Sequence, residues 1–342
     1  MLLNKVMDQP KVAILVPTFN EVGAIECVLR SIISQDYPQE LLEIFFIDAN
    51  SDDGTKEIIL KYQDQHSNIS VYRNRNKIVS SALNVGIKKA KAEILVRMDA
   101  HSSYESNYVS KCVEWLEKTG GDNVGGPMCV EGNGYVGKAI EFVHHSIFGL
   151  GGGKFHIENY EGYVDTVYLG AFRKEIFEKA GLFDESLVRN QDIEMNARIR
   201  KAGGKIYLTP EIRSTYYCRD NLKDLWKQNF ANGYWNVKTV KQNPGALSWR
   251  HFIPFVFVSS LVSLGLSSFF SIYVFVLFLI DISLYLLVNI LFSLAVSFRK
   301  GIKYFPILPI VFAALHLSYG LGSLWGVIKL PFDLLINRKG DC

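Results

Sequence analysis

The stretch Val12-Ala-Ile-Leu-Val-Pro-Thr-Phe-Asn-Glu21 places an apolar run directly before a polar turn. The run Val12–Pro17 is apolar throughout, which predicts a strand that is buried on both faces of a sheet. The residues that follow predict a helix over Glu21–Gln35, for which Asn20 is a suitable N-cap. This passage therefore predicts a first strand–helix unit of an α/β fold.

The same alternation of short apolar runs and helical stretches continues along the chain. Further strands are predicted over Leu42–Asp48 and Glu93–Asp99. Further helices are predicted over residues 53–63, 80–90, 105–118 and 191–202. Repeated strand–helix units of this kind predict a Rossmann-like, mainly parallel sheet, an arrangement that often binds nucleotides.

The last third of the sequence is strongly apolar. From Phe252 to Phe298 the only charged residue is Asp281, and this stretch is long enough for two membrane spans of about 20 residues each. We expect a helical hairpin with its turn near residues 267–271. Asp281 is expected to make a polar contact inside the helix bundle or to help position a lipid acceptor. A further apolar stretch, 304–328, contains two glycines, so it is predicted either as a third span or as a re-entrant hairpin broken at the glycines.

Charge and cysteine content restrict the compartment and the partners. Basic and acidic side chains balance before Phe252, which argues against a nucleic-acid-binding surface. The five cysteines show no CxxC spacing and cannot all pair, which favours a reducing compartment. No signal-peptide pattern precedes the first strand, so residues 1–250 are expected in the cytoplasm. The basic loop Arg299–Lys303 would lie on the same side under the positive-inside rule.

Two carboxylates stand at the ends of predicted strands. Asp48 follows Glu43-Ile-Phe-Phe-Ile47, and Asp99 follows Glu93-Ile-Leu-Val-Arg-Met98. Ligands of open α/β sheets bind outside the carboxyl ends of the strands, so both aspartates are candidates for ligand contacts. A role in shaping a turn or capping a helix is the common alternative for a single aspartate at such a position.

The sequence around these aspartates carries a more specific signal. Pro17-Thr-Phe-Asn-Glu21, Asp48-Ala-Asn-Ser-Asp-Asp-Gly-Thr55 and Asp99-Ala-His101 follow one another in this order. Together they resemble the motifs of the inverting, GT-A-fold glycosyltransferases of family 2. The last motif departs from the family's commonest D-x-D and is similar to the D-A-H of exopolysaccharide glucosyltransferases of the succinoglycan type. The resemblance implies a GT-A fold, with a Rossmann-like mixed sheet, ahead of the apolar helices.

The resemblance also implies roles for the first two motifs. Pro17, Thr18 and Glu21 would line the nucleoside pocket of the donor site, and Asp48 would accept a hydrogen bond from the imide of the base. Asp53 belongs to the same motif as Asp48 and is expected to shape its turn. Carboxylates suit these tasks because they accept several hydrogen bonds at once.

The third motif implies a metal site. Asp99 and His101 would hold a divalent cation on the donor diphosphate, and Asp99 would also contact the donor itself. Such a cation neutralises the charge that develops as the nucleotide leaves. Imidazole suits Mn²⁺ better than Mg²⁺, so the choice between these two metals stays open.

A motif in the second half of the chain implies the catalytic base. Asn190-Gln-Asp-Ile-Glu194 matches a family helix that opens with an E-D pair, although Gln191 replaces the glutamate. Inversion requires a base on the face opposite the leaving diphosphate, and Asp192 is the predicted carboxylate, with Glu194 as a weaker substitute. An acidic residue in the first turn of a helix is also favoured by the helix dipole alone.

Contacts with the acceptor are predicted less specifically. The stretch Gln228-Asn-Phe-Ala-Asn-Gly-Tyr-Trp235 stands where processive members of the superfamily carry Q-x-x-R-W. The Arg-Trp pair is absent, so synthesis of a long polymer is not predicted. Gln228 and Trp235 are candidates for acceptor contacts, and anchoring of an amphipathic helix at the membrane interface explains them equally well.

These assignments predict how the chain is divided. Residues 1–245 would form the catalytic domain, with a donor-binding half over 10–120, an acceptor-binding half over 121–220 and an interfacial helix over 221–245. Residues 252–330 would hold about three transmembrane helices. Residues 331–342 would form a polar tail.

The expected protein is thus a multi-pass enzyme of the cell membrane with a cytoplasmic catalytic domain. Its donor would be a nucleoside-diphosphate sugar, with UDP preferred over GDP. Its acceptor would be a polyprenyl-diphosphate-linked saccharide used in exopolysaccharide or cell-surface glycan synthesis. Two alternatives stay open, namely transfer onto a polyprenyl monophosphate and a catalytically silent membrane scaffold. Nucleic acid is not expected as a partner.

Overall fold

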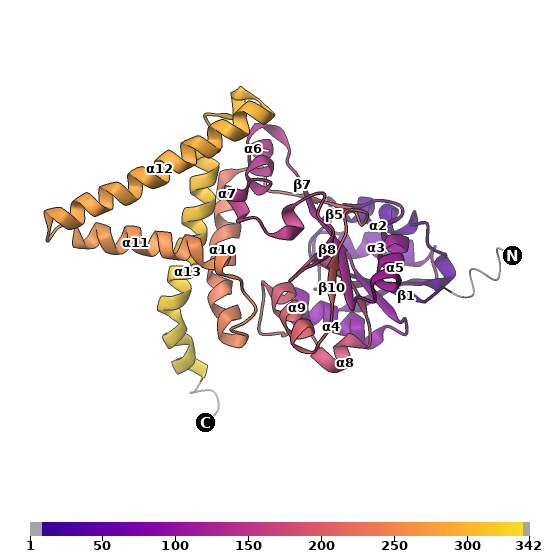
Figure 1. Ribbon diagram of the computed structural model, residues 1–342. Helices are drawn as coiled ribbons and strands as arrows, with labels where there is room; N and C mark the ends of the chain where they lie inside the picture. Colours follow the sequence, from indigo (N-terminus) through magenta and orange to yellow (C-terminus); the bar gives the residue numbers. More distant parts are fainter. Residues whose placement is uncertain (1–8, 338–342) are drawn as a thin grey trace. The chain divides into compact units, whose positions relative to one another are not determined.

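The computed structural model describes residues 9–337, which form two compact units (Figure 1). The first unit contains the described residues up to Cys129 together with Lys154–Tyr217. The second contains Val130–Gly153 and the described residues from Cys218 onward. Residues 130–153 and 218–245, assigned from sequence to the catalytic domain, therefore group with the C-terminal helices.

An eight-stranded mixed sheet forms the centre of the first unit, with the strand order β3-β2-β1-β4-β9-β6-β10-β8. Its strands are β1 (Val12–Thr18), β2 (Leu42–Asp48), β3 (Ile69–Arg73), β4 (Ile94–Arg97), β6 (Asn123–Gly126), β8 (Gly162–Tyr163), β9 (Tyr168–Arg173) and β10 (Ile206–Leu208). Strands β3, β2, β1 and β4 are parallel neighbours, as are β6 and β10. Strand β9 runs antiparallel to β4 and β6, and β8 runs antiparallel to β10.

Helices cover both faces of this sheet (Figure 1). One face carries α2 (Ile25–Ile33), α3 (Thr55–Gln63) and α5 (Tyr108–Thr119), and the other carries α4 (Val79–Lys89), α8 (Ile176–Ala180) and α9 (Gln191–Lys201). Side chains alternate along β1, so that Ile14 joins the first apolar cluster and Leu15 joins the second. The predicted α/β core is therefore confirmed.

The remaining elements of the first unit are short. Strands β5 (Ser102–Tyr104) and β11 (Ser214–Tyr217) pair antiparallel, and single 3₁₀ turns form at η1 (Gln39–Leu41) and η2 (Lys154–His156). The chain passes from the first unit into the second within β7 (Met128–Glu131). Strand β5 lies directly after Asp99 and His101, so it fixes the end of the third motif.

The beginning of α2 differs from the prediction. The helix starts at Ile25 rather than Glu21, and its N-cap position is Ala24 rather than Asn20. Asn20 instead has a φ of 53°, and its Nδ2 donates a hydrogen bond of 2.9 Å to Asp52 Oδ1. The side chain that was predicted to cap a helix therefore joins two loops instead. The start of this helix was predicted less accurately than strands β1 and β2.

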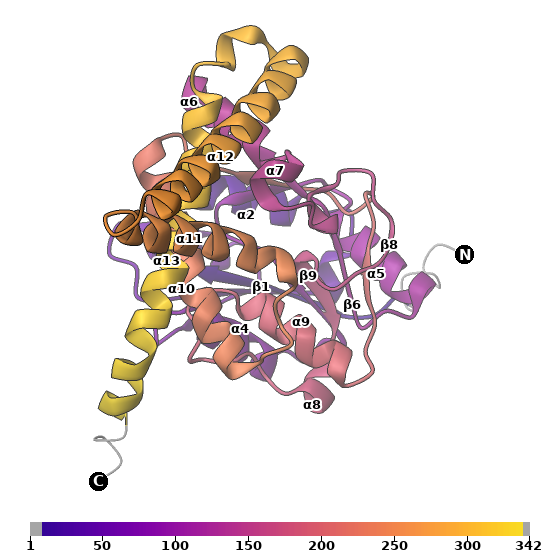
Figure 2. The same ribbon diagram turned by 60° about the vertical axis from the view of Figure 1, so that its left-hand side comes forward.

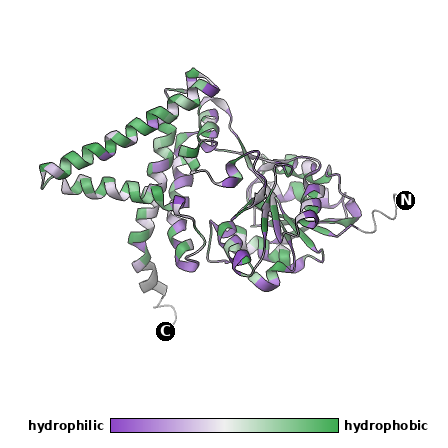
Figure 3. Cartoon of the chain, in the orientation of Figure 1, coloured by the Kyte–Doolittle hydropathy of each residue, from purple (hydrophilic) through white to green (hydrophobic). Residues whose placement is uncertain are grey.

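The second unit is helical and contains three helical segments, among the described residues, that are long and apolar enough to cross a membrane. These segments are Trp249–Ser267, Ile272–Lys300 and Leu308–Pro331. Figure 3 shows that hydrophobic residues predominate along the first two. The helices of this unit are α6 (Gly134–His144), α7 (Ile147–Leu150), α10 (Leu222–Gln242), η3 (Trp249–Phe252), α11 (Ile253–Ser267), α12 (Ile272–Lys300), η4 (Ile302–Tyr304) and α13 (Leu308–Asn337). The predicted hairpin turn lies between α11 and α12.

Helix α13 is continuous, so the alternative of a re-entrant hairpin is wrong. Its glycines serve close packing instead of a chain reversal. A Cβ atom at Gly322 would lie 2.0 Å from the carbonyl oxygen of Phe230 on α10, and one at Gly320 would lie 2.3 Å from that of Pro254 on α11. Small residues allow helix backbones to approach in this way. Helix α10 accordingly runs beside α13 in both views (Figures 1 and 2).

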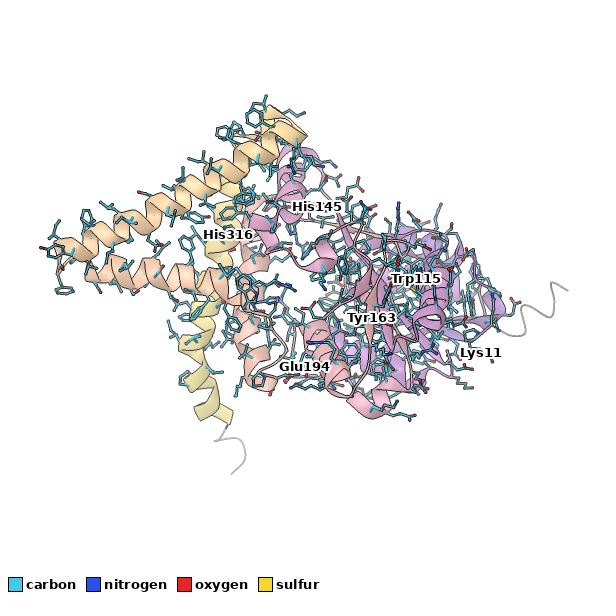
Figure 4. The ribbon with its side chains drawn as sticks, in the orientation of Figure 1. Lys11, Trp115, His145, Tyr163, Glu194 and His316 are labelled. Carbon is cyan, nitrogen blue, oxygen red and sulfur yellow. The ribbon has the colours of Figure 1, made fainter. Side chains whose placement is uncertain are left out.

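Polar side chains within the apolar helices find partners on neighbouring segments. Ser260 on α11 donates a hydrogen bond of 2.8 Å to Asp281 Oδ2 on α12, which confirms the predicted polar contact. His316 on α13, labelled in Figure 4, lies 2.7 Å from the carbonyl oxygen of Phe148 through Nε2 and 3.2 Å from the Tyr285 hydroxyl through Nδ1. The histidine that interrupts the third apolar stretch therefore has a place inside the helical unit.

Candidate active site

Strands β1, β2 and β4 of the first unit deliver the three motifs to one edge of the sheet. Thr18 and Asp48 are register partners at the ends of β1 and β2, and β4 ends at Arg97, two residues before Asp99. The carboxyl ends of parallel strands meet at the same edge, which is where open α/β sheets bind ligands. The fold therefore brings together motifs that are separated by up to about 80 residues in the sequence.

Side chains of the second motif hold the loop that follows β1. Asp53 Oδ2 accepts a hydrogen bond from the backbone N–H of Val22 at 3.0 Å, and its Oδ1 accepts from the Thr55 hydroxyl at 2.6 Å. The hydroxyl oxygen of Thr55 in turn accepts from the backbone N–H of Glu21 at 2.8 Å. The bond from the Thr55 hydroxyl is the main reason why the pKa of Asp53 is lowered. Asp53 thus shapes this turn, as expected.

Asp48 is engaged within its own loop. Its side chain is buried, and Oδ2 accepts hydrogen bonds from the backbone N–H groups of Asn50 and Ser51 at 2.9 and 3.1 Å. Its Oδ1 accepts from the Ser51 hydroxyl at 2.6 Å. Asp48 is also not among the residues that line the pocket at this edge. Its contact with a nucleotide base stays a prediction.

A pocket of about 130 Å³ opens at the carboxyl edge of the strands. Five predicted site residues line it together, namely Pro17, Thr18, Glu21, Asp99 and His101. The sequence had not singled out the other lining residues, which are Phe19, Ala49, Asn74, Lys77, Ile78, Val79 and Ala82. The structure therefore gathers residues from the first and third motifs and adds a wall formed by the loop between β3 and α4.

Glu21 and His101 meet at this pocket. His101 Nδ1 lies 3.1 Å from Glu21 Oε1, and about half of the imidazole is exposed. The backbone N–H of Asp99 donates to the Tyr104 hydroxyl at 2.5 Å, which anchors the loop between them. In the described part of the chain, no group of three or more His, Cys, Asp or Glu side chains is arranged to hold a metal ion. The role of Asp99 and His101 as metal ligands therefore stays a prediction.

One buried arginine connects the predicted metal ligand to the predicted base. Arg97 Nε donates to Asp99 Oδ1 at 3.0 Å, and Arg97 Nη1 donates to Asp192 Oδ1. Only 7% of the Arg97 side chain is exposed, compared with 33% of that of Asp192. Asp192 stands in the first turn of α9, so its bond with Arg97 joins α9 to the end of β4. The two carboxylates therefore share one guanidinium.

The shared guanidinium sets the electrostatics of the cluster. Desolvation would lower the pKa of Arg97, but the charges of Asp192 and Asp99 outweigh it and raise that pKa. The pKa of Asp192 is raised by desolvation, an effect that the positive charge of Arg97 opposes. A carboxylate with a raised pKa and one exposed side is suited to accept a proton.

Arg97 was not proposed from the sequence, although a signal was present. It is the only charged residue of β4, whose other residues are Ile94, Leu95 and Val96. Burying a charge inside a strand costs much free energy unless the charge is paired, so a buried arginine indicates acidic partners nearby. The identity of one partner, Asp192, could not be read from the sequence, because it lies 95 residues further along the chain.

The two residues predicted to contact the acceptor lie on α10, in the second unit. Gln228 Oε1 accepts a hydrogen bond from Arg219 Nε at 3.2 Å. The Trp235 ring lies beside that of Tyr234 at 5.8 Å between centroids, and Lys238 Nζ lies 5.0 Å from the Trp235 ring. A contact of either residue with an acceptor stays a prediction.

Comparison with known proteins identifies the first unit. The family model described as Glycosyl transferase family 2 matches residues 13–181, which contain β1, β2, β4, the pocket and most of the sheet. The chain is a glycosyltransferase with a family 2 domain. Asp192 and α9 lie beyond the matched residues, so the assignment of the base in this glycosyltransferase rests on the geometry around Arg97.

Two curated relatives of this glycosyltransferase extend beyond the family model. One is a dolichyl N-acetyl-alpha-D-glucosaminyl phosphate 3-beta-D-2,3-diacetamido-2,3-dideoxy-beta-D-glucuronosyltransferase of Methanococcus voltae, 27% identical over 93% of this chain and 97% of the relative. The other is the succinoglycan biosynthesis protein ExoA of Rhizobium meliloti (strain 1021), 29% identical over 70% of this chain and 73% of the relative. The first relative therefore also covers the helical unit of the glycosyltransferase.

Among solved structures, the mannosyltransferase PcManGT from Pyrobaculum calidifontis, in complex with GDP-Man and Mn²⁺, superposes with a TM-score of 0.61. The superposition covers 94% of this glycosyltransferase and 88% of the other chain, at 18% sequence identity. At this identity the likeness concerns the fold alone. It confirms the GT-A-like fold that the motifs implied.

Proposed function

We propose that this glycosyltransferase moves a sugar, with inversion, from a nucleoside-diphosphate donor to a lipid-linked saccharide at a membrane surface. The observation that carries the proposal is the contact of one buried guanidinium, that of Arg97, with both Asp99 and Asp192. Asp99 lines the pocket, and Asp192 has an exposed side. The proposed base and one residue of the proposed donor site thus share one guanidinium, which supports proton transfer close to the donor.

Asp192 acts as the base in this proposal. Its carboxylate takes the proton of the acceptor hydroxyl while the hydroxyl oxygen forms a bond to the anomeric carbon of the donor sugar. The bond between that carbon and the diphosphate oxygen breaks at the same time, and the nucleoside diphosphate leaves with the electron pair. Arg97 holds one oxygen of Asp192 in place and prevents repulsion between the two carboxylates.

Asp99 and His101 are suited to hold a divalent cation together with the donor diphosphate. A carboxylate and an imidazole from the protein leave most coordination positions to phosphate oxygens, which is common where a cation is bound together with a phosphorylated substrate. When bound, the cation stabilises the charge on the leaving diphosphate. Glu21 supports this pair because it contacts His101 Nδ1 and so fixes the orientation of the imidazole. Mn²⁺ and Mg²⁺ are both candidates, with the imidazole favouring Mn²⁺.

We infer that the acceptor is a polyprenyl-linked saccharide and that the helical unit anchors the enzyme in the cell membrane. Three apolar helical segments support the anchor, and the names of the two relatives, which refer to a dolichyl-linked sugar phosphate and to succinoglycan synthesis, support the acceptor class. The basic loop Arg299–Lys303 after α12 would face the cytoplasm, together with the catalytic unit. Such an acceptor fits a role in exopolysaccharide or cell-surface glycan assembly.

The first experiment measures nucleotide release from a panel of UDP- and GDP-sugars by the full-length protein in detergent or lipid. Mn²⁺ or Mg²⁺ and an extract of lipid-linked saccharides are present, and the Asp192→Asn variant is measured in parallel. We expect release with one donor, UDP-linked in preference to GDP-linked, and a loss in kcat of about 10²- to 10⁴-fold in the variant. Asp184→Asn is the matched control, because Asp184 Oδ1 accepts a hydrogen bond from the Ser186 backbone within its own loop.

Product analysis separates the alternatives. A lengthened saccharide on a diphosphate linker supports transfer onto a lipid-linked sugar, whereas a single sugar on one phosphate indicates transfer onto polyprenyl monophosphate. Acceptor-dependent release from none of the donors, by a protein that is folded, would favour the silent scaffold. Equal activity of Asp192→Asn and wild type would remove Asp192 from the role of base.

A further inference from the structure

The loop between β3 and α4 contains a strained lysine. Lys77 has a φ of 54°, in the left-handed region that residues with a Cβ atom adopt only at a cost in free energy. Glycine adopts this conformation without that cost and would be the expected residue if only the path of the loop mattered. Strained residues of this kind tend to occur at ligand sites, so Lys77 is a candidate for a functional role.

The surrounding structure enforces this backbone conformation. Asn74, which is buried, accepts a hydrogen bond from the backbone N–H of Asn76 at 3.2 Å and donates one of 2.8 Å to the carbonyl oxygen of Ile78. Asn76 Nδ2 donates to Glu185 Oε2 at 2.8 Å, which ties the tip of the loop to the segment before α9. The residues on both sides of Lys77 are thus fixed, which sets the direction in which its side chain leaves the backbone.

The side chain of Lys77 belongs to the wall of the pocket that Asp99 and His101 also line. Its Nζ lies 5.3 Å from the centre of the Phe19 ring, which is half exposed at the same pocket. Lys77 is the only lysine or arginine among the described residues that line the pocket. Arg75, two residues earlier in the same loop, is exposed but does not line it.

Charge indicates what this ammonium group binds. The pocket presents the carboxylates of Glu21 and Asp99, so a diphosphate that enters it meets negative charge on the protein side. In the described part of the structure Lys77 forms no salt bridge with either carboxylate, and the contact with the Phe19 ring leaves its ammonium available to an anion. Ammonium groups are common phosphate ligands because they act as compact, mobile charges.

We propose that Lys77 binds the diphosphate of the donor and that the left-handed backbone at this residue is maintained for that contact. The proposal rests on the proposed function, because it requires a nucleoside-diphosphate donor in this pocket. It assigns the loop between β3 and α4 to the donor site, which none of the three motifs includes. Lys77 is a binding residue in this account and takes no part in proton transfer.

The experiment measures the binding of UDP and of uridine, with GDP and guanosine in parallel, to the full-length protein by calorimetry with Mn²⁺ present. Three variants separate strain from charge. Lys77→Gln removes the charge and keeps the strain, Lys77→Gly removes both, and Lys77→Arg keeps the charge. Arg75→Gln is the matched control, since it removes a cation from the same loop outside the pocket.

We expect Lys77→Gln and Lys77→Gly to weaken the binding of the diphosphate by about tenfold or more, and to leave the binding of the free nucleoside unchanged. Lys77→Arg and Arg75→Gln should stay within about threefold of wild type. Lys77→Gly should melt at the same temperature as wild type or higher, because the strain is removed. Weaker binding of the diphosphate together with a melting temperature that is unchanged or higher cannot result from a purely structural role of Lys77.

Three results would overturn the inference. Unchanged diphosphate affinity in Lys77→Gln would exclude a contact with the phosphates, and an equal loss for nucleoside and diphosphate would move Lys77 to the base or ribose. An equal loss of diphosphate affinity in Arg75→Gln would show that the effect comes from the net charge of the loop and not from a contact of Lys77. If the wild-type protein binds neither UDP nor GDP, the proposed donor class is wrong. This outcome is distinguishable from a failure of the Lys77 proposal, because it appears in the wild type before any variant is compared.

Discussion

The two units of this glycosyltransferase expose opposite kinds of residue. In the first unit apolar side chains lie inside, and Ile14 and Phe46 are completely buried between the sheet and its helices. In the second unit Phe270 is 90% exposed and Tyr273 is 81% exposed, whereas Ser293 of α12 is completely buried. Apolar residues therefore face outward where the chain has its membrane-type helices and inward where it has its sheet.

This difference shows that different forces hold the two units together. The sheet unit is stabilised by removal of apolar surface from water. In the helical unit a column of polar groups runs along α12: Ser297 Oγ donates to the carbonyl oxygen of Ser293 at 2.7 Å, and Asn289 Nδ2 donates to that of Pro309 at 3.0 Å. Hydrogen bonds and close packing of small residues are what associates helices in lipid, where apolar surface gains nothing from burial against protein.

The largest difference is expected when an exposed leucine is replaced by aspartate, once on an apolar helix of the second unit and once on the surface of the sheet unit. Leu287, near the middle of α12, is 56% exposed, and Leu60 on α3 is 39% exposed. Leu287→Asp should oppose membrane insertion of α12 by about 3–4 kcal/mol, because the side chain would face hydrocarbon. Leu60→Asp should change the free energy of unfolding by less than about 0.5 kcal/mol. The fraction of protein recovered in washed membranes, with a glycosylation-site reporter for insertion, measures the first effect, and normal insertion of Leu287→Asp would contradict the comparison.

The next effect concerns the packing of the helical unit. A Cβ atom at Gly322 would meet the backbone of Phe230 on α10, whereas one at Gly265 on α11 would meet the ring of Phe278 at 3.4 Å, which is ordinary contact distance. Gly322→Ala should therefore destabilise the helical unit by about 1–3 kcal/mol, and Gly265→Ala by much less. Thermal unfolding in detergent, followed by tryptophan fluorescence, checks the difference, since Trp226, Trp235, Trp249 and Trp325 lie in the helical unit. Equal melting temperatures of the two variants would show that α10 and α13 do not pack as closely as described.

The smallest effect is expected in the pH dependence of the catalytic unit, which buries the charged side chain of Arg97 beside Asp192. Desolvation raises the pKa of Asp192, and a base works only when deprotonated, so kcat should rise with pH through a midpoint above the ordinary aspartate value of about 4. Arg97→Gln removes the charge that opposes desolvation, so its midpoint should move to higher pH. Arg213→Gln is a suitable control, because Arg213 is exposed and lies 3.9 Å from Glu105. An unchanged midpoint in Arg97→Gln would show that Arg97 does not act on the base.

Elements with strong local signals were predicted well from the sequence. Strand β2 has the predicted bounds, the turn between α11 and α12 lies where two apolar stretches meet, and α9 begins at the predicted Gln191. Continuous apolar runs and abrupt changes in polarity determine these elements, and both are visible in the sequence alone. Strand β3, Ile69–Arg73, was missed because it is short and contains as many polar as purely aliphatic residues.

The candidate site was predicted only where its residues belong to a contiguous motif. Thr18, Glu21 and His101 line the pocket as expected, since each follows a predicted strand within a few residues. Lys77 could not be predicted, because its importance depends on a backbone angle and on bonds made by Asn74 and Asn76. For Asn20 the local signal was misleading, because this residue type often caps helices, but its side chain bonds to Asp52 in the folded protein.

The unequal lengths of α11 and α12 have a consequence for the bilayer. Helix α12 has 29 residues and α11 has 15. At 1.5 Å per residue these lengths are about 43 Å and 22 Å, on either side of a hydrocarbon thickness of about 30 Å. The preceding turn η3 brings the first span to 19 residues, Trp249–Ser267, which is close to this thickness. The mismatch therefore falls on α12, and tilt of that helix would relieve it. Lipids with longer acyl chains would let α12 stand more upright.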